Sequence, residues 1–179
     1  MRSDGRPDPP GEAGSPALRD NDRGSGKPAL SLRNLAFVVA AGVVAVDQLT
    51  KWWAVNELAD APVVLIEDFL QLRLTYNTAA TFSLFSNAGP ILAIVAFGVV
   101  GLIIYILGEA GRRVEAVALG LVLGGAVGNL IDRLARGDGL LDGAVVDFID
   151  FSFFATFNVA DAAINIGVAL LLIAAFVWR

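Results

Sequence analysis

The chain of 179 residues contains no cysteine and no histidine. Without cysteine there can be no disulfide and no thiol nucleophile; without histidine there is no His-based triad, no imidazole proton shuttle and no imidazole metal ligand. Any hydrolytic chemistry must therefore use carboxylates, hydroxyls, lysine or asparagine. The net charge of −5 says little about partners, because much of the acidity lies in the N-terminal tail and at loop ends. No nucleic-acid partner is expected.

Apolar side chains are abundant, at 56% of the residues, and the mean hydropathy is +0.67. Charged residues cluster in the N-terminal tail and between apolar blocks, which is typical of an integral membrane protein. Residues 1–32 combine Gly, Pro, Ser and mixed charge, so we expect a disordered cytoplasmic tail. We expect residues 33–179 to form one membrane domain.

Four apolar segments each approach the ~20 residues that a helix needs to span a bilayer. The sequence therefore predicts an all-α membrane protein with four transmembrane helices. Basic residues flank the first segment, join the second to the third and end the chain, so both termini and the 108–113 turn are expected in the cytoplasm. The connections 56–88 and 135–158 then face outward. The expected helices are Leu35–Val55, Gly89–Leu107, Glu115–Leu134 and Val159–Trp178.

The two outer connections have patterns of their own. In residues 70–77 apolar and polar side chains alternate, which predicts a strand that pairs with residues 63–66 as a small β-hairpin on the outer membrane surface. Residues 143–151 are apolar around two aspartates and predict a short amphipathic element on the same face. Trp52, Trp53 and Trp178 fit interfacial belts at the two membrane surfaces.

Under this topology the intramembrane polar residues gather at one depth, near the outer leaflet. A channel or proton relay would string its ionisable groups across the membrane, whereas a site acting at the outer surface needs them together. The pattern therefore favours a surface site. Its members are Asp47, Lys51, Asn129, Asp132, Arg133, Asn158 and Asp161.

Several of these residues have a simpler structural interpretation. Asp47 and Lys51 are spaced i, i+4, so they could form a plain ion pair with the lysine snorkelling outward, or they could support a site. Asn158 could cap the last helix and place Asp161 near position N3, where the helix dipole favours an anion. The glycines of residues 123–129 could be helix contacts or could leave room for a substrate chain.

Carboxylate pairs are the remaining chemical candidates. Two carboxyls held close in an apolar site cannot both ionise easily, so one keeps a proton while the other acts as a base toward water. That is the requirement of an aspartic peptidase. Asp161 could pair with either Asp147 or Asp132, and Asp150 has similar apolar neighbours but no evident partner.

Five blocks, in this order, resemble those of the lipoprotein signal peptidases, also called signal peptidase II. They are VDQLTKWW (46–53), YNTAATFSLF (76–85), LGGAVGNLIDRL (123–134), VVDFIDF (145–151) and FNVADAAINIG (157–167). The resemblance covers nearly the whole chain beyond the tail. It implies an aspartic endopeptidase that cuts on the amino side of a diacylglyceryl-modified cysteine in prolipoproteins, with no metal or other cofactor.

The resemblance also assigns residues. It implies that Asp147 and Asp161 are the catalytic pair, which decides between Asp132 and Asp147. It further implies membrane lipids as partners, and we expect a monomer. Where the family usually has Gly and Ala, this chain has Ala79 and Thr81, so the substrate groove is expected to differ in shape. Substrate-contacting or supporting positions are Asp47, Lys51, Asn77, Gly125, Asn129, Asp132, Arg133 and Asn158.

One alternative from another functional class remains. The chain could be a non-catalytic membrane scaffold or a small transporter whose aspartates are structural. Conservative Asp→Asn substitutions separate the two, because an amide can preserve hydrogen bonds but cannot act as a base.

Overall fold

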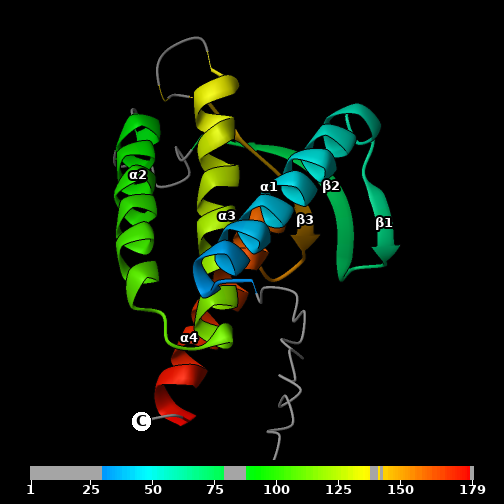
Figure 1. Cartoon of the computed structure of the whole chain (residues 1–179). Helices are drawn as coiled ribbons and strands as arrows, with labels where there is room; N and C mark the ends of the chain where they lie inside the picture. The colour runs from blue at the N-terminus through cyan, green and yellow to red at the C-terminus, as the bar shows by residue number, and fades with distance from the viewer. Residues whose placement is uncertain (1–29, 79–87, 138–140, 142, 178–179) are drawn as a thin grey trace, which may run out of the picture.

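The structure is a computed structural model that describes residues 30–78, 88–137, 141 and 143–177 (Figure 1). The expected tail falls outside the described residues except for its last three, and Leu32 already belongs to the first helix. Ala79, Thr81 and Trp178 also lie outside the described residues, so the predictions about them stay predictions. The described elements are α1 (Leu32–Glu57), β1 (Val63–Ile66), β2 (Leu70–Asn77), α2 (Ala88–Ile106), the 3-10 turn η2 (Leu107–Glu109), α3 (Arg113–Ala135), β3 (Val145–Phe151) and α4 (Val159–Val177).

The four expected helices are confirmed. Each described boundary lies within three residues of the predicted one, and all four helices are long and apolar enough to cross a membrane. The first helix begins earlier than expected because Ser31 caps it: the Ser31 hydroxyl accepts a hydrogen bond of 3.2 Å from the backbone N–H of Asn34.

The third helix is the centre of the bundle and contacts each of the other three (Figure 1). Its glycines allow this close approach. A Cβ added at Gly124 would lie 2.7 Å from the carbonyl oxygen of Ala40 in α1, and one added at Gly125 would collide with the carbonyl of Ala160 in α4. The glycines of residues 123–129 are therefore helix contacts, which the sequence alone could not establish.

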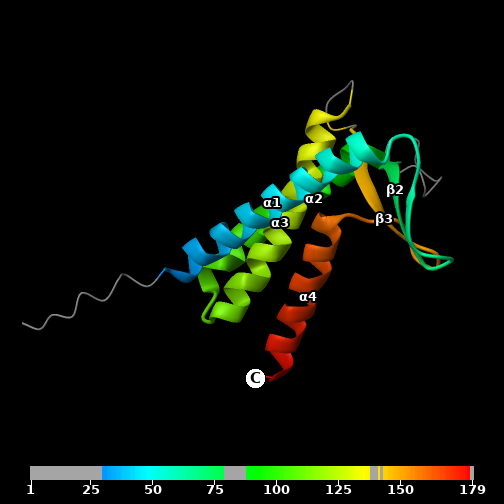
Figure 2. The same ribbon diagram turned by 90° about the vertical axis from the view of Figure 1, so that its right-hand side faces the viewer.

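A three-stranded antiparallel sheet, in the order β1-β2-β3, joins the helices at one end of the bundle (Figure 2). The predicted hairpin is confirmed, and its turn places Asp68 at φ 57°, a conformation that aspartate tolerates better than most residues. The expected amphipathic element is the third strand. It pairs with the edge of β2 that the hairpin leaves open, so one partner far along the chain determines its structure.

Apolar contacts attach the sheet to the helices. Ala54 of α1 and Leu58, which directly follows that helix, pack with Phe148 of β3. After β3 the chain folds back, and Phe157 exchanges backbone hydrogen bonds with Ile149, at 3.0 and 2.9 Å. This fold-back brings the start of α4 beside the middle of β3.

Candidate active site

The candidate site begins with the cap of α4. The side-chain oxygen of Asn158 accepts a 2.9 Å hydrogen bond from the backbone N–H of Asp161. In return, Asp161 Oδ2 accepts a 3.2 Å bond from the backbone N–H of Asn158. Asp161 is thus residue N3 of α4, where an anion interacts favourably with the helix dipole. The predicted capping role of Asn158 is confirmed, and its amide has further partners.

Asp147 lies on β3 with its carboxylate held by two amides. Nδ2 of Asn158 donates to Asp147 Oδ1 at 2.7 Å, and Nδ2 of Asn77 donates to Asp147 Oδ2 at 3.1 Å. Asn77 reaches this oxygen because Thr75, two residues earlier on β2, is paired with Asp147 across the sheet. Asn158 therefore contacts both Asp147 and the N-terminal turn that carries Asp161.

The surroundings of Asp147 change its acidity. Asp147 is 2% exposed, and burial raises its pKa to about 6; the charge of Asp161 acts in the same direction. The hydrogen bonds from Asn77 and Asn158 and the charge of Lys51 oppose the rise. Asp147 therefore takes up a proton far more readily than an exposed aspartate.

Asn129 of α3 connects this region to the buried Lys51 of α1. Its Nδ2 donates to Asp161 Oδ1 at 2.8 Å. Its Oδ1 accepts from the amide of Asn158 at 3.1 Å and from the ammonium of Lys51 at 2.9 Å. These bonds join the end of α3 that carries Asn129 to the start of α4 that carries Asn158 and Asp161.

Lys51 is fully buried, so the interpretation in which it snorkels outward is wrong. Its ammonium lies 2.9 Å from Asp47 Oδ2, 2.9 Å from Asp132 Oδ2 and 2.9 Å from Asn129 Oδ1. These three acceptors match the three donors of an ammonium group. Within the described part of the chain, every buried side-chain nitrogen and oxygen atom has a hydrogen-bond partner.

The two aspartates bound by Lys51 also hold backbone next to the candidate pair. Asp47 Oδ1 accepts a 2.9 Å hydrogen bond from the N–H of Ala160, the residue before Asp161. Asp132 Oδ2 accepts a 3.2 Å bond from the N–H of Val146, the residue before Asp147. Lys51, Asp47 and Asp132 therefore position both candidate catalytic residues without contacting them.

The remaining predicted residues take distinct places. Arg133 donates to the carbonyl of Asn129 at 3.2 Å, and the charges of Asp161, Asp132 and Asp147 all act on its guanidinium. Gly125 lies under the first turns of α4, where a Cβ would also come within 2.7 Å of Ile164. The atoms nearest to it belong to Ala160 and Ile164, so it serves the packing of α4 on α3.

Asp150 has partners that sequence reasoning did not find. Its carboxylate accepts hydrogen bonds from Gln71 at 2.7 Å, Arg73 at 2.9 Å and Thr156 at 3.2 Å. Although burial opposes them, these bonds lower the pKa of Asp150. An odd separation along β3 directs Asp147 and Asp150 to opposite faces of the strand. Asp150 therefore stabilises the sheet on the face away from the candidate pair.

Two further residues of the polar network were not singled out from the sequence. Gln48 donates to Asp47 Oδ2 at 3.1 Å and to the carbonyl of Gly128 at 3.1 Å. Arg136 donates to Asp132 Oδ1 at 3.0 Å. The i, i+4 spacing of Asp132 and Arg136 was the available signal for that ion pair. Nothing local marked Gln48.

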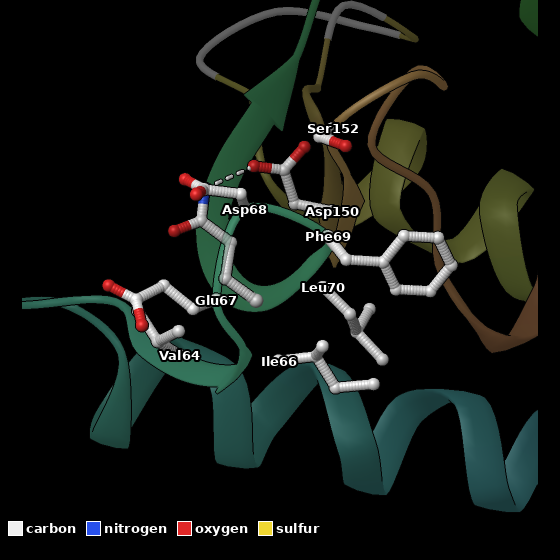
Figure 3. A pocket seen from close by; sticks show the side chains of 9 residues that line it. Val64, Ile66, Glu67, Asp68, Phe69, Leu70, Asp150 and Ser152 are labelled. Atoms are coloured by element: carbon white, nitrogen blue, oxygen red, sulfur yellow. Dashed lines mark hydrogen bonds between the residues drawn. The ribbon is translucent and has the colours of Figure 1, made fainter.

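A cavity of about 350 Å³ lies beside the β1–β2 turn (Figure 3). Asp150 and Ser152 line it together with apolar side chains of the hairpin, including Val64 and Ile66. Neither Asp147 nor Asp161 lines it. The candidate chemistry therefore belongs to the polar junction of α1, α3, β3 and α4 and is separate from this cavity.

The geometry of the junction suits one kind of chemistry. One carboxyl has its pKa raised to about 6, and a second carboxylate acts on it electrostatically. Such a pair can share one proton, with the ionised member acting as base and the protonated member as acid. Fixed amides orient both groups, so little reorganisation is needed during a reaction.

Comparison with known proteins identifies the family. The sequence profile described as "Signal peptidase (SPase) II" matches residues 39–177. Lipoprotein signal peptidases of Rhodococcus jostii and Shouchella clausii are each 44% identical, over 79% and 78% of this chain and 72% and 91% of theirs. The enzyme of Mycolicibacterium smegmatis is 42% identical over 93% of this chain and 67% of its own.

Solved structures agree with the sequence relatives. One described as "Bacterial membrane enzyme structure by the in meso method at 1.9 A resolution" has a TM-score of 0.69 and 30% identity over 80% of this chain and 94% of its own. A second, at 2.3 Å, has a TM-score of 0.67, also at 30% identity, over 79% of this chain and 87% of its own. Together with the four apolar helices, these matches make the protein a multi-pass membrane peptidase. The chain belongs to the signal peptidase II family.

Proposed function

We propose that this protein is an aspartic endopeptidase that removes signal peptides from diacylglyceryl-modified prolipoproteins, cutting on the amino side of the lipidated cysteine. Asp147 and Asp161 are the catalytic pair. The observation that carries the proposal is the shared contact at Asn158, which binds the carboxylate of Asp147 while it caps the helix that begins with Asp161. Membership of a peptidase family does not favour the non-catalytic scaffold or transporter.

The reaction requires one water and one shared proton. The ionised carboxylate of the pair takes a proton from the water, and the water oxygen attacks the scissile carbonyl carbon. The protonated carboxyl assists the carbonyl oxygen and then gives a proton to the leaving amine, which regenerates the pair. The raised pKa of Asp147, about 6, supports Asp147 as the protonated partner. No step uses a metal.

Arg133 and the asparagines have supporting roles in this proposal. The amides of Asn77, Asn129 and Asn158 hold the two carboxylates in place. A pair that shares one proton carries one negative charge, and the positive charge of Arg133 stabilises it. The lipid tails of the substrate lie against the bundle, so the bilayer helps to position the scissile bond.

The proposed topology places this chemistry near the outer leaflet, with both termini in the cytoplasm. Basic residues at Arg33, Arg112 and Arg113 support the orientation. The sheet and the polar junction lie at the opposite end of α1 and α3 from these arginines. We further propose that the enzyme acts as a monomer on substrates delivered within the membrane.

A cleavage assay tests the proposal. Purified protein in detergent is incubated with a diacylglyceryl-modified prolipoprotein, and the product is resolved by its shift on a gel. We expect Asp147→Asn and Asp161→Asn to lose about 10²- to 10⁴-fold in rate. Asp150→Asn is the matched control on the same strand and should retain activity. An unmodified prolipoprotein should remain uncut.

Two outcomes would contradict the proposal. Full activity of folded Asp161→Asn would exclude the pair, and a folded wild-type protein that cleaves nothing would exclude the peptidase assignment for this substrate. Gel filtration and circular dichroism establish folding for every variant, so lost activity cannot be confused with lost structure.

A further inference from the structure

An apolar groove of about 500 Å³ lies between α1 and α2, with α3 as its floor. Both α1 and α2 contact α3, and small side chains on α1 leave space between α1 and α2. All the residues that line the groove are apolar. They are Phe37, Ala40, Ala41, Val44 and Ala45 of α1, Val100 and Ile104 of α2, and Leu123 and Val127 of α3.

The groove lies away from the candidate active site. Leu123 and Val127 face the groove, whereas Gly125 contacts α4 and Asn129 binds Asp161. Positions two residues apart on a helix point about 200° away from each other, so α3 separates the two regions. The groove and the candidate pair therefore lie on different faces of α3.

Along α1 the groove has about the length of one leaflet. Its wall on α1 runs from Phe37 to Ala45, about 12 Å at the rise of an α-helix, and lies in the half of α1 nearer its N-terminus. One leaflet of the hydrocarbon core is about 15 Å thick, half of the usual 30 Å. The dimensions match most of the length of one acyl chain.

A positively charged side chain, that of Arg33, lies beside Phe37 at one end of the groove. Arg33 is one helical turn before Phe37, and its guanidinium carbon is 5.8 Å from the centre of the Phe37 ring. The Arg33 side chain is exposed. Among the described residues it has no acidic ion-pair partner. A guanidinium of this kind can bind a phosphate through two parallel hydrogen bonds.

We propose that this groove holds one acyl chain of an anionic phospholipid, drawn from the leaflet at the N-terminal end of α1, and that Arg33 binds its phosphate. Arg33 and Phe37 combine a charge with an apolar entrance, as in other basic sites at the ends of transmembrane grooves. The occupied groove supports the spacing of α1 and α2 on α3. This lipid site does not depend on the peptidase reaction.

Native mass spectrometry of the full chain provides the test. Delipidated protein is titrated with phosphatidylglycerol or with phosphatidylcholine that has the same acyl chains. Both lipids carry the phosphate, but in phosphatidylcholine the choline cation offsets its charge. We therefore expect one phosphatidylglycerol to bind about fivefold more tightly than phosphatidylcholine, the effect of one arginine near an anionic headgroup. Arg33→Gln should remove this preference, and Arg33→Lys should restore part of it.

A second set of variants tests the groove itself. Ala41 and Ala45 are exposed along the wall, so Ala41→Leu with Ala45→Leu fills the space without disturbing packed contacts. This double variant should lose bound lipid of both kinds. Ala169→Leu is the matched control, because Ala169 is exposed on α4 outside the groove. It should bind lipid like the wild type.

Three results would overturn the proposal. They are equal binding of the two lipids by the wild type, an unchanged preference in Arg33→Gln, and unchanged lipid binding in the filled-groove variant. A dimer that the filled-groove variant abolishes would instead assign the groove to a second copy of the chain. Circular dichroism shows whether each variant has kept its helices.

Discussion

Asn158 Nδ2 lies 2.7 Å from Asp147 Oδ1, so the residue that caps α4 also holds a carboxylate on β3. The same side chain accepts the N–H of Asp161 through its oxygen. The nitrogen and the oxygen of the Asn158 amide are thus both hydrogen-bonded. They fix the position of Asp147 relative to Asp161, although the two aspartates belong to different elements. The arrangement leads to four predictions.

The pH dependence should follow the proton held by the pair. Because burial raises the pKa of Asp147 to about 6, kcat/KM should fall as the pH rises through about 6 and the proton is lost. The amide of Asn77 lowers this pKa, so Asn77→Ala should raise it and move the falling limb to higher pH. A limb that stays in place or moves to lower pH would refute this. The apparent pKa values read from this profile describe the two carboxyls together and not Asp147 alone.

The ionised form of Asp147 should also lower the free energy of unfolding at neutral pH. Its pKa of about 6 in the folded protein exceeds the value of ~3.9 for an unfolded aspartate, so its favourable contribution is complete below pH ~4 and is lost as the pH rises through about 6. The Asn variant has no such loss. The difference in unfolding free energy between Asp147→Asn and wild type should therefore shift in favour of the variant as the pH rises from acidic to neutral, by at most about 3 kcal/mol. Thermal unfolding in detergent at the two pH values measures the gain; an equal difference at both would contradict it.

Lys51 should be essential for stability because it neutralises two buried carboxylates. Lys51→Met leaves Asp47 and Asp132 without their shared cation and should cost about 3–5 kcal/mol. In an Asp132→Asn background the same substitution should cost less, since one buried charge is already absent. Equilibrium unfolding of the four proteins measures this coupling. Equal costs in both backgrounds would show that the pair does not interact.

Gly125 should be needed for the approach of α4 to α3. Gly125→Ala places a Cβ against the carbonyl of Ala160, so we expect a loss of about 1–3 kcal/mol and a lower kcat as Asn129 moves from Asp161. The matched control is Gly98→Ala in α2, whose Cβ would meet nothing within 4 Å. It should be neutral or stabilising. Equal effects of the two substitutions would argue against close packing at Gly125.

The four helices and the hairpin could be predicted from sequence because their signals are local. A run of about 20 apolar residues determines a membrane helix whatever lies elsewhere in the chain. Alternation in residues 70–77 likewise identified β2. Asn158 and Asp161 could be placed as cap and N3 residue, because three residues of spacing determine that geometry.

Only the tertiary structure decided how the polar residues combine. β3 is a strand because β2 offers it an edge, and Lys51 is buried because Asn129, 78 residues away, and Asp132 complete its coordination. Asp47 reaches the N–H of Ala160 across 113 residues of sequence. No local pattern encodes such a contact, because it exists only after the glycines of α3 have let three helices approach each other.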